Sequence, residues 1–250
     1  MNHNIVPVSA MDTFCFSCSP AVPCFNECCR DLNQFLTPYD ILRLKNELNL
    51  ASGEFLAQYT RMHTGPESGL PIVTLKPHDT HRLTCPFVTP DGCRVYENRP
   101  SSCRTYPLMR AVSRCRKTGK LTEQFWLLKE VHCRGFEAGD TWSVKQWIDQ
   151  QGAAVYNEFN DRLMEIIGLK NQHLPGPLDG KSRQMFYTAL YDLDHFRSQI
   201  ADEGLPDGLG MDGGIAPAIL DAAVNDDVAL LDLGMQWVKQ MLLFRNHHNR

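Results

Sequence analysis

The chain has 250 residues, of which 43% are hydrophobic and 22% carry a charge, and this composition is that of an ordinary globular protein rather than of a disordered or collagen-like chain. Its 25 basic and 29 acidic residues give a net charge of −4, so the chain has no overall attraction for anionic lipid or nucleic acid, and nucleic acid is not an expected partner. No uncharged apolar stretch approaches the roughly 18 residues of a membrane span, so no membrane partner is expected either.

Two short helices are predicted in the first quarter of the chain. Thr37 is suited to cap the first helix, with Pro38 at the first helical position and Asp40 as a favourable charge in the first turn. Apolar residues spaced by three and four predict an amphipathic helix over 38–48, and they are Ile41, Leu44 and Leu48. Ser52 is suited to cap the second helix, which carries Phe55, Leu56 and Tyr59.

The segment from 64 to 133 predicts small strands and turns. Gly and Pro separate three short β-prone runs, which lie at 72–75, 94–96 and 125–131. Pro100 is placed to open a short helix that carries Cys103.

The last part of the chain is predicted to be mainly helical. Ser143 and Gln146 form an S-x-x-Q capping box. A helix is expected behind it over about 143–168, with an apolar face formed by Trp147, Val155, Phe159, Leu163 and Ile167.

A linker at 171–182 and a further helix over 182–201 are expected next, followed by a Gly-rich turn at 204–214. This turn contains a G-x-G-x-x-G pattern, but no strand precedes it, and the dinucleotide motif requires that context. We therefore interpret it as a flexible loop. A final amphipathic helix is predicted from Val228, Leu231, Met235, Val238 and Leu242.

All ten cysteines lie between Cys15 and Cys133. They are too sparse for a disulfide scaffold, in which about 8–10% of residues are cysteine. The N-terminus also lacks the basic start and apolar core of a signal peptide. In a reducing cytosol, clustered thiols are more often metal ligands or catalytic groups than disulfides. We therefore expect a cytoplasmic, metal-binding protein, with disulfide bonding as the less favoured alternative.

The cysteine spacing limits the kind of centre. Thiolate is a soft ligand that selects zinc, copper(I) and iron–sulfur clusters. One tetrahedral zinc needs only four ligands, so eight or more thiols indicate a polynuclear cluster, two neighbouring sites, or one site with spare thiols. The side chains of the adjacent Cys28 and Cys29 must diverge, which favours several metal ions or two sites close together. A ferredoxin-like C-x2-C-x2-C run is absent.

The ordered motifs resemble the YkgJ-like cysteine-cluster family over about residues 14–136. They are Phe16-x-Cys18, Cys24-x3-Cys28-Cys29, CPF at 85–87, GCRVYENRP at 92–100, CRTYP at 103–107 and Cys133-x-Gly135. This family is described as zinc- or iron-chelating, so the resemblance implies a metal ion or cluster as partner: an iron–sulfur cluster or iron, with zinc as the alternative. The metal ligands that it implies are Cys18, Cys24, Cys28, Cys29, Cys85, Cys93, Cys103 and Cys133.

The chain departs from the family pattern at the first ligand. The family has two residues between the first two cysteines of the cluster, whereas five separate Cys18 from Cys24. Cys15 therefore remains an alternative to Cys18. Cys115 matches no family position and is interpreted as a free thiol.

Basic and imidazole side chains accompany the cysteines. Arg99 and Arg104 lie inside the resembling motifs and are expected to bind the centre, because guanidinium groups stabilise the negative charge of thiolates. His78, His81 and His132 lie near cysteines and are of the type that replaces thiolate in zinc or Rieske-like sites. With ten thiols at hand, we interpret these histidines as surface or core residues.

We expect an α+β fold, in which a small mixed cysteine-rich metal-binding domain over 1–140 is followed by a mainly α-helical region over 141–250 that packs on it or extends it. The leading hypothesis is an iron–sulfur or other polynuclear iron centre with a redox or modification-related role. One alternative is a structural zinc module whose helical region binds a protein partner. Another is a methylase-like or redox-modifying enzyme, because similar clusters occur in flagellin lysine methylases. No catalytic residue is assigned.

Overall fold

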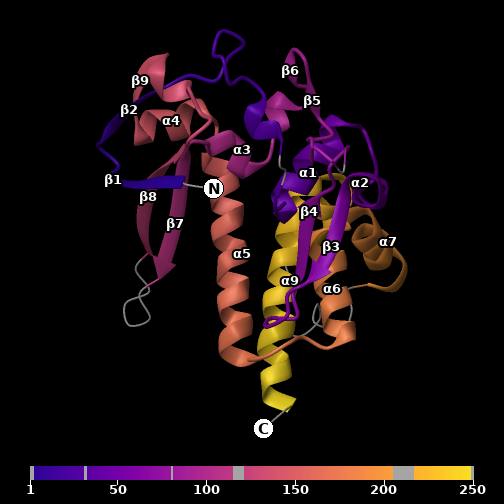
Figure 1. Ribbon diagram of the computed structural model, residues 1–250. Helices are drawn as coiled ribbons and strands as arrows, with labels where there is room; N and C mark the ends of the chain where they lie inside the picture. Colours follow the sequence, from indigo (N-terminus) through magenta and orange to yellow (C-terminus); the bar gives the residue numbers. More distant parts are fainter. Residues whose placement is uncertain (1–2, 31–32, 80, 115–120, 205–216, 249–250) are drawn as a thin grey trace. The chain divides into compact units, whose positions relative to one another are not determined.

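The computed structural model of the protein describes residues 3–30, 33–79, 81–114, 121–204 and 217–248 (Figure 1). It has the expected α+β class, with short antiparallel strands, several helices and a helical C-terminal region. Contacts divide the chain into two compact units, one formed by residues 1–34 and 77–158 and the other by residues 35–76 and 159–250. The sequence suggested a contiguous division near residue 140, whereas both of these units are discontinuous.

The first unit contains the cysteines and is built, in its described part, from small antiparallel sheets and short helices. One sheet has the order β1-β8-β7 and comprises His3–Val8, Leu121–Glu130 and Leu108–Arg114. Strand β2 pairs with β9, and β5 pairs with β6, with the bounds Thr13–Phe16, Asp140–Ser143, Val88–Thr89 and Gly92–Cys93. The helices and 3-10 turns are η1 (Glu27–Cys29), η2 (Tyr96–Asn98), α3 (Ser101–Thr105), η3 (Gly135–Glu137) and α4 (Val144–Gln150).

An aromatic core holds this first unit together. Phe14 and Phe16 alternate along β2 and are both buried on the same face of the strand. The ring of Trp147 meets each of them edge to face, at centroid distances of 5.7 and 5.5 Å. The indole N–H of Trp147 donates to the carbonyl of Thr105 at 2.8 Å, so the buried indole has its polar atom satisfied. This core anchors the strands from which the cysteine-bearing turns project.

The second unit combines the hairpin β3-β4 with helices from both ends of the sequence. Its elements are α1 (Pro38–Glu47), α2 (Ser52–Tyr59), β3 (Thr60–Thr64), β4 (Pro71–Leu75), α5 (Ala154–His173) from residue 159 onward, α6 (Gly180–Leu190), α7 (Leu193–Glu203), α8 (Pro217–Asn225) and α9 (Asp227–His248). Helix α9 packs against α1, α6, α7 and α8. It approaches α6 so closely that a Cβ at Gly234 would collide with the carbonyl oxygen of Ala189.

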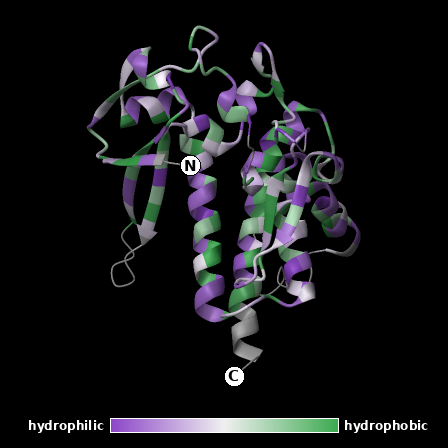
Figure 2. Ribbon diagram, viewed as in Figure 1, coloured by the Kyte–Doolittle hydropathy of each residue, from purple (hydrophilic) through white to green (hydrophobic). Residues whose placement is uncertain are grey.

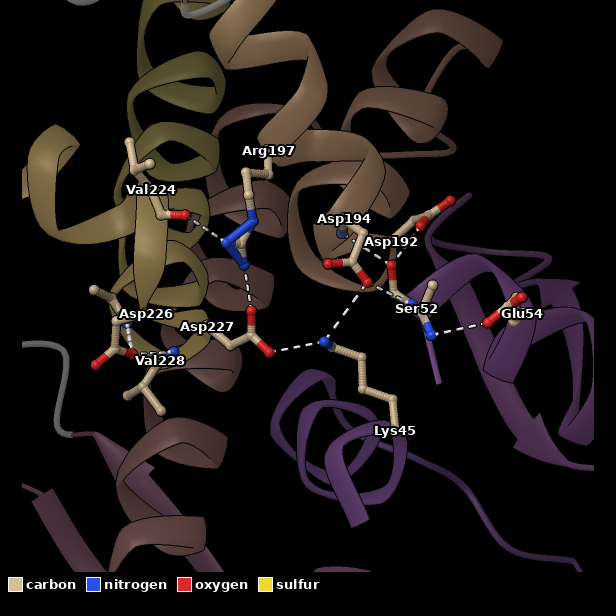
Figure 3. A network of polar contacts seen from close by, with 12 residues as sticks. Lys45, Ser52, Glu54, Asp192, Asp194, Arg197, Val224, Asp226, Asp227 and Val228 are labelled. Carbon is tan, nitrogen blue, oxygen red and sulfur yellow. Dashed lines mark hydrogen bonds and ion pairs between the residues drawn. The ribbon is translucent and has the colours of Figure 1, made fainter. Parts of the chain in front are cut away.

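A polar network joins helices of the second unit that lie far apart in the sequence (Figure 3). The ammonium of Lys45 on α1 lies 2.7 Å from Asp227 Oδ2 at the start of α9 and 3.6 Å from Asp194 Oδ2 on α7. Arg197 pairs with the other oxygen of Asp227. At the start of α2, the Ser52 amide donates to Asp194 Oδ2 at 2.6 Å. Because Lys45 is 5% exposed, this network orients α1 and α2 on the C-terminal helices at a desolvated position.

The first predicted helix is confirmed as α1, while the second differs at its cap. Thr37 caps α1, and its own amide donates to Asp40 Oδ2 at 2.9 Å, so Asp40 completes a capping box as a first-turn charge. Ser52 does not cap α2, because Ala51 occupies the cap position and Ser52 is the first helical residue. Its hydroxyl donates instead to Asp192 Oδ1 at 2.7 Å.

The predicted strands are confirmed at two of three places. The run at 72–75 lies in β4, and the run at 125–131 overlaps the end of β8. The prediction of a strand at 94–96 is wrong, because β6 ends at Cys93 and η2 begins at Tyr96. The short helix expected after Pro100 is confirmed as α3.

The helix expected over 143–168 is two helices. The Ser143 capping box is confirmed at the start of α4. The chain then breaks at Gly152, whose φ of +57° is the left-handed conformation that ends a helix. The buried face of α5 is rotated from the predicted one, since Val155 is exposed and the buried residues are Tyr156, Phe159, Leu163 and Ile166. Figure 2 shows the resulting mixture of hydrophobic and hydrophilic residues along α5.

The C-terminal helices are longer and more numerous than predicted. Helix α5 continues to His173, which shortens the linker expected at 171–182, and the helix expected over 182–201 is divided into α6 and α7. The final helix is confirmed as α9, although Val228 is exposed. The Gly-rich turn lies almost wholly outside the described residues. Among the described helices, none combines the length and the apolar character needed to cross a bilayer.

Candidate metal centre

Three cysteine-bearing segments of the first unit meet through backbone hydrogen bonds. The Cys85 amide donates to the carbonyl of Cys29 at 2.8 Å, and the Ser17 amide donates to the carbonyl of Gly135 at 3.0 Å. The Arg134 amide donates to Cys24 Sγ at 3.0 Å. These bonds bring the segment before η1, the turn before β5 and the turn after β8 to one place.

Local backbone geometry makes this convergence feasible. A series of tight turns precedes η1, and Asn26 adopts a left-handed φ of 69° there. The Asn26 side-chain amide donates to the Thr89 carbonyl at 2.9 Å, which ties η1 to the β5-β6 hairpin. Gly135 explains the glycine of the Cys133-x-Gly135 motif, because a Cβ there would lie 2.6 Å from the Phe16 ring and from the Ser17 carbonyl oxygen.

One group of thiols gathers around Cys28. Its electrostatic neighbours include Cys18 and Cys133, and Cys18 in turn neighbours Cys24 and Cys133. Burial is the largest cause that raises the pKa of Cys28 to about 12, and the nearby thiols and Glu130 contribute in the same direction. Burial likewise raises the pKa of Cys18, with added contributions from Cys24 and Cys133.

A second group gathers around Cys29. Burial raises the pKa of Cys29 to about 12, and its neighbouring charges are Cys85, Cys93 and Cys18. Burial also raises the pKa of Cys85 to about 11, with Cys93 contributing in the same direction. Apart from the shared Cys18 and from each other, Cys28 has Cys133 as its electrostatic neighbour, whereas Cys29 has Cys85 and Cys93. Cys18 is the member that both groups share.

The raised pKa values indicate that the clustered thiols require a bound cation to become thiolates. Half-buried sulfurs that are close to one another resist becoming thiolates, because each negative charge opposes the next and water is partly excluded. A cation placed among them stabilises the negative charges, so the thiols lose their protons and bind it as thiolates. None of the nine cysteines in the described part of the chain is in a disulfide. The donor set is thus suited to soft or borderline metal ions.

The remaining predicted cysteine positions lie at or beyond the edge of these groups. Cys103 on α3 is exposed, and its thiol donates to Gln34 Oε1 at 3.5 Å while Arg99 is an electrostatic neighbour. The thiol of Cys15, which lies on β2, donates to the carbonyl of Gly139, the residue before β9, at 3.2 Å. Cys115 lies outside the described residues.

The two arginines have different surroundings. Burial lowers the pKa of Arg99, and the neighbouring Cys103 and Cys93 act in the opposite direction, so the guanidinium lies within the field of the cluster. Arg104 donates to the carbonyls of Glu97 and Gln151 and lies over the ring of Tyr156. The described contacts of Arg104 are thus those of a residue that organises the backbone around α3.

The structure adds three polar side chains that the sequence interpretation did not assign to the site. The Tyr106 hydroxyl donates to Glu130 Oε2 at 3.0 Å, and burial followed by contact with Cys133 raises the pKa of Tyr106 strongly. His132 Nε2 lies 3.8 Å from Cys28 Sγ. The signals were present in the sequence, because Tyr106 belongs to the CRTYP motif and His132 immediately precedes Cys133. His78 and His81 are exposed.

The fold and the clustered thiols define a cysteine-rich metal-chelating domain. The family model CxxCxxCC, described as "Putative zinc- or iron-chelating domain", matches residues 17–134. This description is that of the YkgJ-like family that the motifs resemble, and the match spans the segment from just before Cys18 to just after Cys133. The match begins after Cys15 and ends after Cys133. No curated protein and no solved structure matches the chain.

Proposed function

We propose that this domain holds an iron–sulfur or other polynuclear iron centre on its clustered thiolates. The observation that carries the proposal is the divergence of Cys28 and Cys29 toward two sulfur groups that share Cys18. A single tetrahedral ion takes four ligands and cannot use both groups. A centre with several metal ions, joined by sulfide or by a shared thiolate, can use them all.

The ligands in this proposal are the eight cysteines that the resemblance implies. Seven of them each have at least one other of the seven as an electrostatic neighbour, namely Cys18, Cys24, Cys28, Cys29, Cys85, Cys93 and Cys133. Cys103 is the eighth, and its charge acts on Arg99 together with that of Cys93. Cys18 is preferred to Cys15, because the Cys15 thiol donates to the carbonyls of Ala138 and Gly139, just before β9.

Arg99 is the charged residue that we assign to the bound centre. It lies close enough to Cys93 and Cys103 for their charges to act on it, and a guanidinium beside a thiolate-rich centre offsets its negative charge. Arg104 supports Arg99 indirectly, since both donate to Gln151. When bound, the centre would supply one-electron chemistry or an oxidant-sensitive site, or it would stabilise the fold.

The setting and partners follow from the same chemistry. Thiols stay reduced in the cytoplasm, so we infer that the protein works there. Three of the ligand thiols, Cys18, Cys28 and Cys103, are exposed, which leaves the centre within reach of a redox partner or an oxidant. The helical C-terminal region is the part that we propose to bind a protein partner.

The test is anaerobic purification of the full chain, followed by elemental analysis, acid-labile sulfide determination and visible absorption. The proposal predicts more than one iron per chain and a brown protein with broad visible absorption. Sulfide in proportion to iron identifies an iron–sulfur cluster, whereas iron without sulfide identifies another polynuclear site. A folded protein that contains no metal would contradict the proposal.

A structural zinc module is the second candidate function. Cys29 has the thiols of Cys18, Cys85 and Cys93 as electrostatic neighbours. Together these four thiolates would complete one structural zinc site. Zinc would then contribute folding energy and perform no chemistry. A colourless protein with stoichiometric zinc after anaerobic purification favours this candidate over the iron centre.

A further inference from the structure

Three chemically different ligands converge at the outer edge of the cysteine cluster. Cys28 Sγ lies 3.8 Å from His132 Nε2, and His132 Nε2 lies 3.5 Å from Glu130 Oε2. The sulfur, nitrogen and oxygen atoms all lie within 4.8 Å of one another. Cys28 belongs to η1, whereas Glu130 ends β8 and His132 lies in the following turn, so the fold brings them together from opposite ends of the unit.

The spacing of these atoms fits one metal ion. Zinc bonds of about 2.3 Å to sulfur and about 2.0–2.1 Å to nitrogen and oxygen, at tetrahedral angles, place sulfur and nitrogen about 3.6 Å apart and nitrogen and oxygen about 3.4 Å apart. The observed separations of 3.8 and 3.5 Å differ from these values by a few tenths of an ångström. An ion can therefore enter with little movement of the side chains.

The carboxylate is held in place independently of any metal. The Tyr106 hydroxyl donates to Glu130 Oε2 at 3.0 Å. The turn that follows β8 is closed by a hydrogen bond from the Cys133 amide to the Glu130 carbonyl at 3.0 Å. Such outer contacts orient ligands and are typical of metal sites. They make Glu130 a positioned oxygen donor next to the thiol of Cys28.

We propose that Cys28, Glu130 and His132 bind one divalent metal ion, Zn²⁺ or Fe²⁺, at the solvent-exposed edge of the cluster, with the fourth coordination position open to water. The mixture of soft, borderline and hard donors suits these ions. Cys28 is exposed and the His132 side chain is 45% exposed, so the open position faces solvent. Three protein ligands with an open position are the arrangement of catalytic rather than structural zinc.

This inference rests on the proposed function for the thiolate of Cys28, which the edge site shares with the thiolate-rich centre. It goes beyond that function, because an ion with an exchangeable ligand can bind a substrate oxygen or activate a water molecule, which a fully thiolate-ligated centre does not do. Its other two ligands, Glu130 and His132, do not belong to the cysteine set. The two proposals can therefore fail separately.

The experiment compares the anaerobically purified full chain with His132→Ala, Glu130→Gln and, as a matched control, His63→Ala, since His63 is an exposed histidine on β3. Iron, zinc and acid-labile sulfide per chain are measured. The edge site is then emptied with a mild chelator and titrated with Co²⁺, and X-ray absorption reports imidazole bound to the ion. We expect His132→Ala to lose one metal equivalent and the imidazole signal, and Glu130→Gln to weaken Co²⁺ binding at least 10-fold.

The remaining measurements separate the outcomes. Cluster iron or sulfide should stay unchanged in all three variants, and His63→Ala should match the parent chain. A variant with Tyr106→Phe keeps all three ligands and should weaken Co²⁺ binding without changing the stoichiometry. Metal content and imidazole signal that survive His132→Ala would overturn the edge site while leaving the thiolate centre standing. A parent chain without any metal would overturn both.

Discussion

The ammonium of Lys45 lies 2.7 Å from Asp227 Oδ2, which joins α1 to the first turn of α9 across 182 residues of sequence. Lys45 is almost fully buried, and Arg197 pairs with the second carboxylate oxygen of Asp227. Burial alone would raise the pKa of Asp227, but the hydrogen bonds and charge of Lys45, together with Asn46 and Arg197, lower it. This carboxylate is therefore the centre of the network in Figure 3.

Removing that carboxylate should destabilise the protein. Asp227→Asn leaves Lys45 buried with only the more distant Asp194, and we expect a loss of about 3 kcal/mol in the free energy of unfolding. Lys45→Met should cost less, because Asp227 keeps Arg197 as a partner. Because the folded pKa of Asp227 is lowered, its contribution is present above the unfolded pKa near 4 and is lost as pH falls through the folded pKa. Urea unfolding at pH 7 and pH 3 measures this, and an Asp227→Asn deficit of the same size at both pH values would contradict it.

The adjacent cysteines provide a direct test of the metal centre. Because Cys28 and Cys29 face different sulfur groups, Cys28→Ser and Cys29→Ser should each lower the metal content of anaerobically purified protein. Cys15→Ser is the matched control, and it should leave metal content unchanged. Elemental analysis per chain, with circular dichroism to check the fold, gives the answer. Normal stoichiometry in both single variants would rule out the shared centre.

Alkaline pH should destabilise the metal-free protein. The thiols of Cys28 and Cys29 have folded pKa values raised from about 9 to about 12. The unfolded chain therefore loses these protons first, and stability that is present below pH 9 is lost as the pH rises toward 12. Thermal melts of reduced apoprotein between pH 8 and 11 should show a steeper decline for the parent chain than for Cys28→Ser/Cys29→Ser. If the two proteins lose stability in parallel as the pH rises, the burial of these thiols does not destabilise the folded state at alkaline pH.

Two glycines in the second unit should respond oppositely to alanine. A Cβ at Gly234 would collide with the Ala189 carbonyl, so Gly234→Ala should separate α6 from α9 and cost more than about 1 kcal/mol. No atom lies within 4 Å of a Cβ built at Gly168 on α5, so Gly168→Ala should stabilise by about 0.5–1 kcal/mol through helix propensity. Chemical denaturation of both variants checks this, and two effects of the same sign would be inconsistent with the packing.

Truncation tests the proposed domain division at residues 140–141. A chain that ends at residue 170 keeps every proposed ligand, and we expect it to retain its metal content. Helices α1 and α2 nevertheless lose α7 and α9, against which they pack, and expose buried side chains such as Leu44 and Phe55. We therefore expect lower stability and dye-detectable apolar surface. Soluble truncated protein without metal would contradict an autonomous cysteine domain.

Local signals in the sequence were sufficient to predict several features. Thr37 and Pro38 specify the start of α1 because capping depends on groups within one turn. The divergence of Cys28 and Cys29 follows from backbone geometry at adjacent positions. The motifs around the cysteines were sufficient to predict the resemblance to the family, because their order and short spacings can be read directly from the sequence. The alternation of short β-prone runs and helical patterns was sufficient to predict the α+β class.

Only the tertiary structure decided how distant segments meet. No periodicity links Lys45 to Asp227 or Cys28 to His132, because each pair is brought together by tertiary packing between segments that are distant in the sequence. The break at Gly152 was missed for a related reason: the apolar spacing continues across it, while a single left-handed φ redirects the backbone. The sequence therefore determined which potential metal ligands the chain carries, and folding determined which of them lie close together.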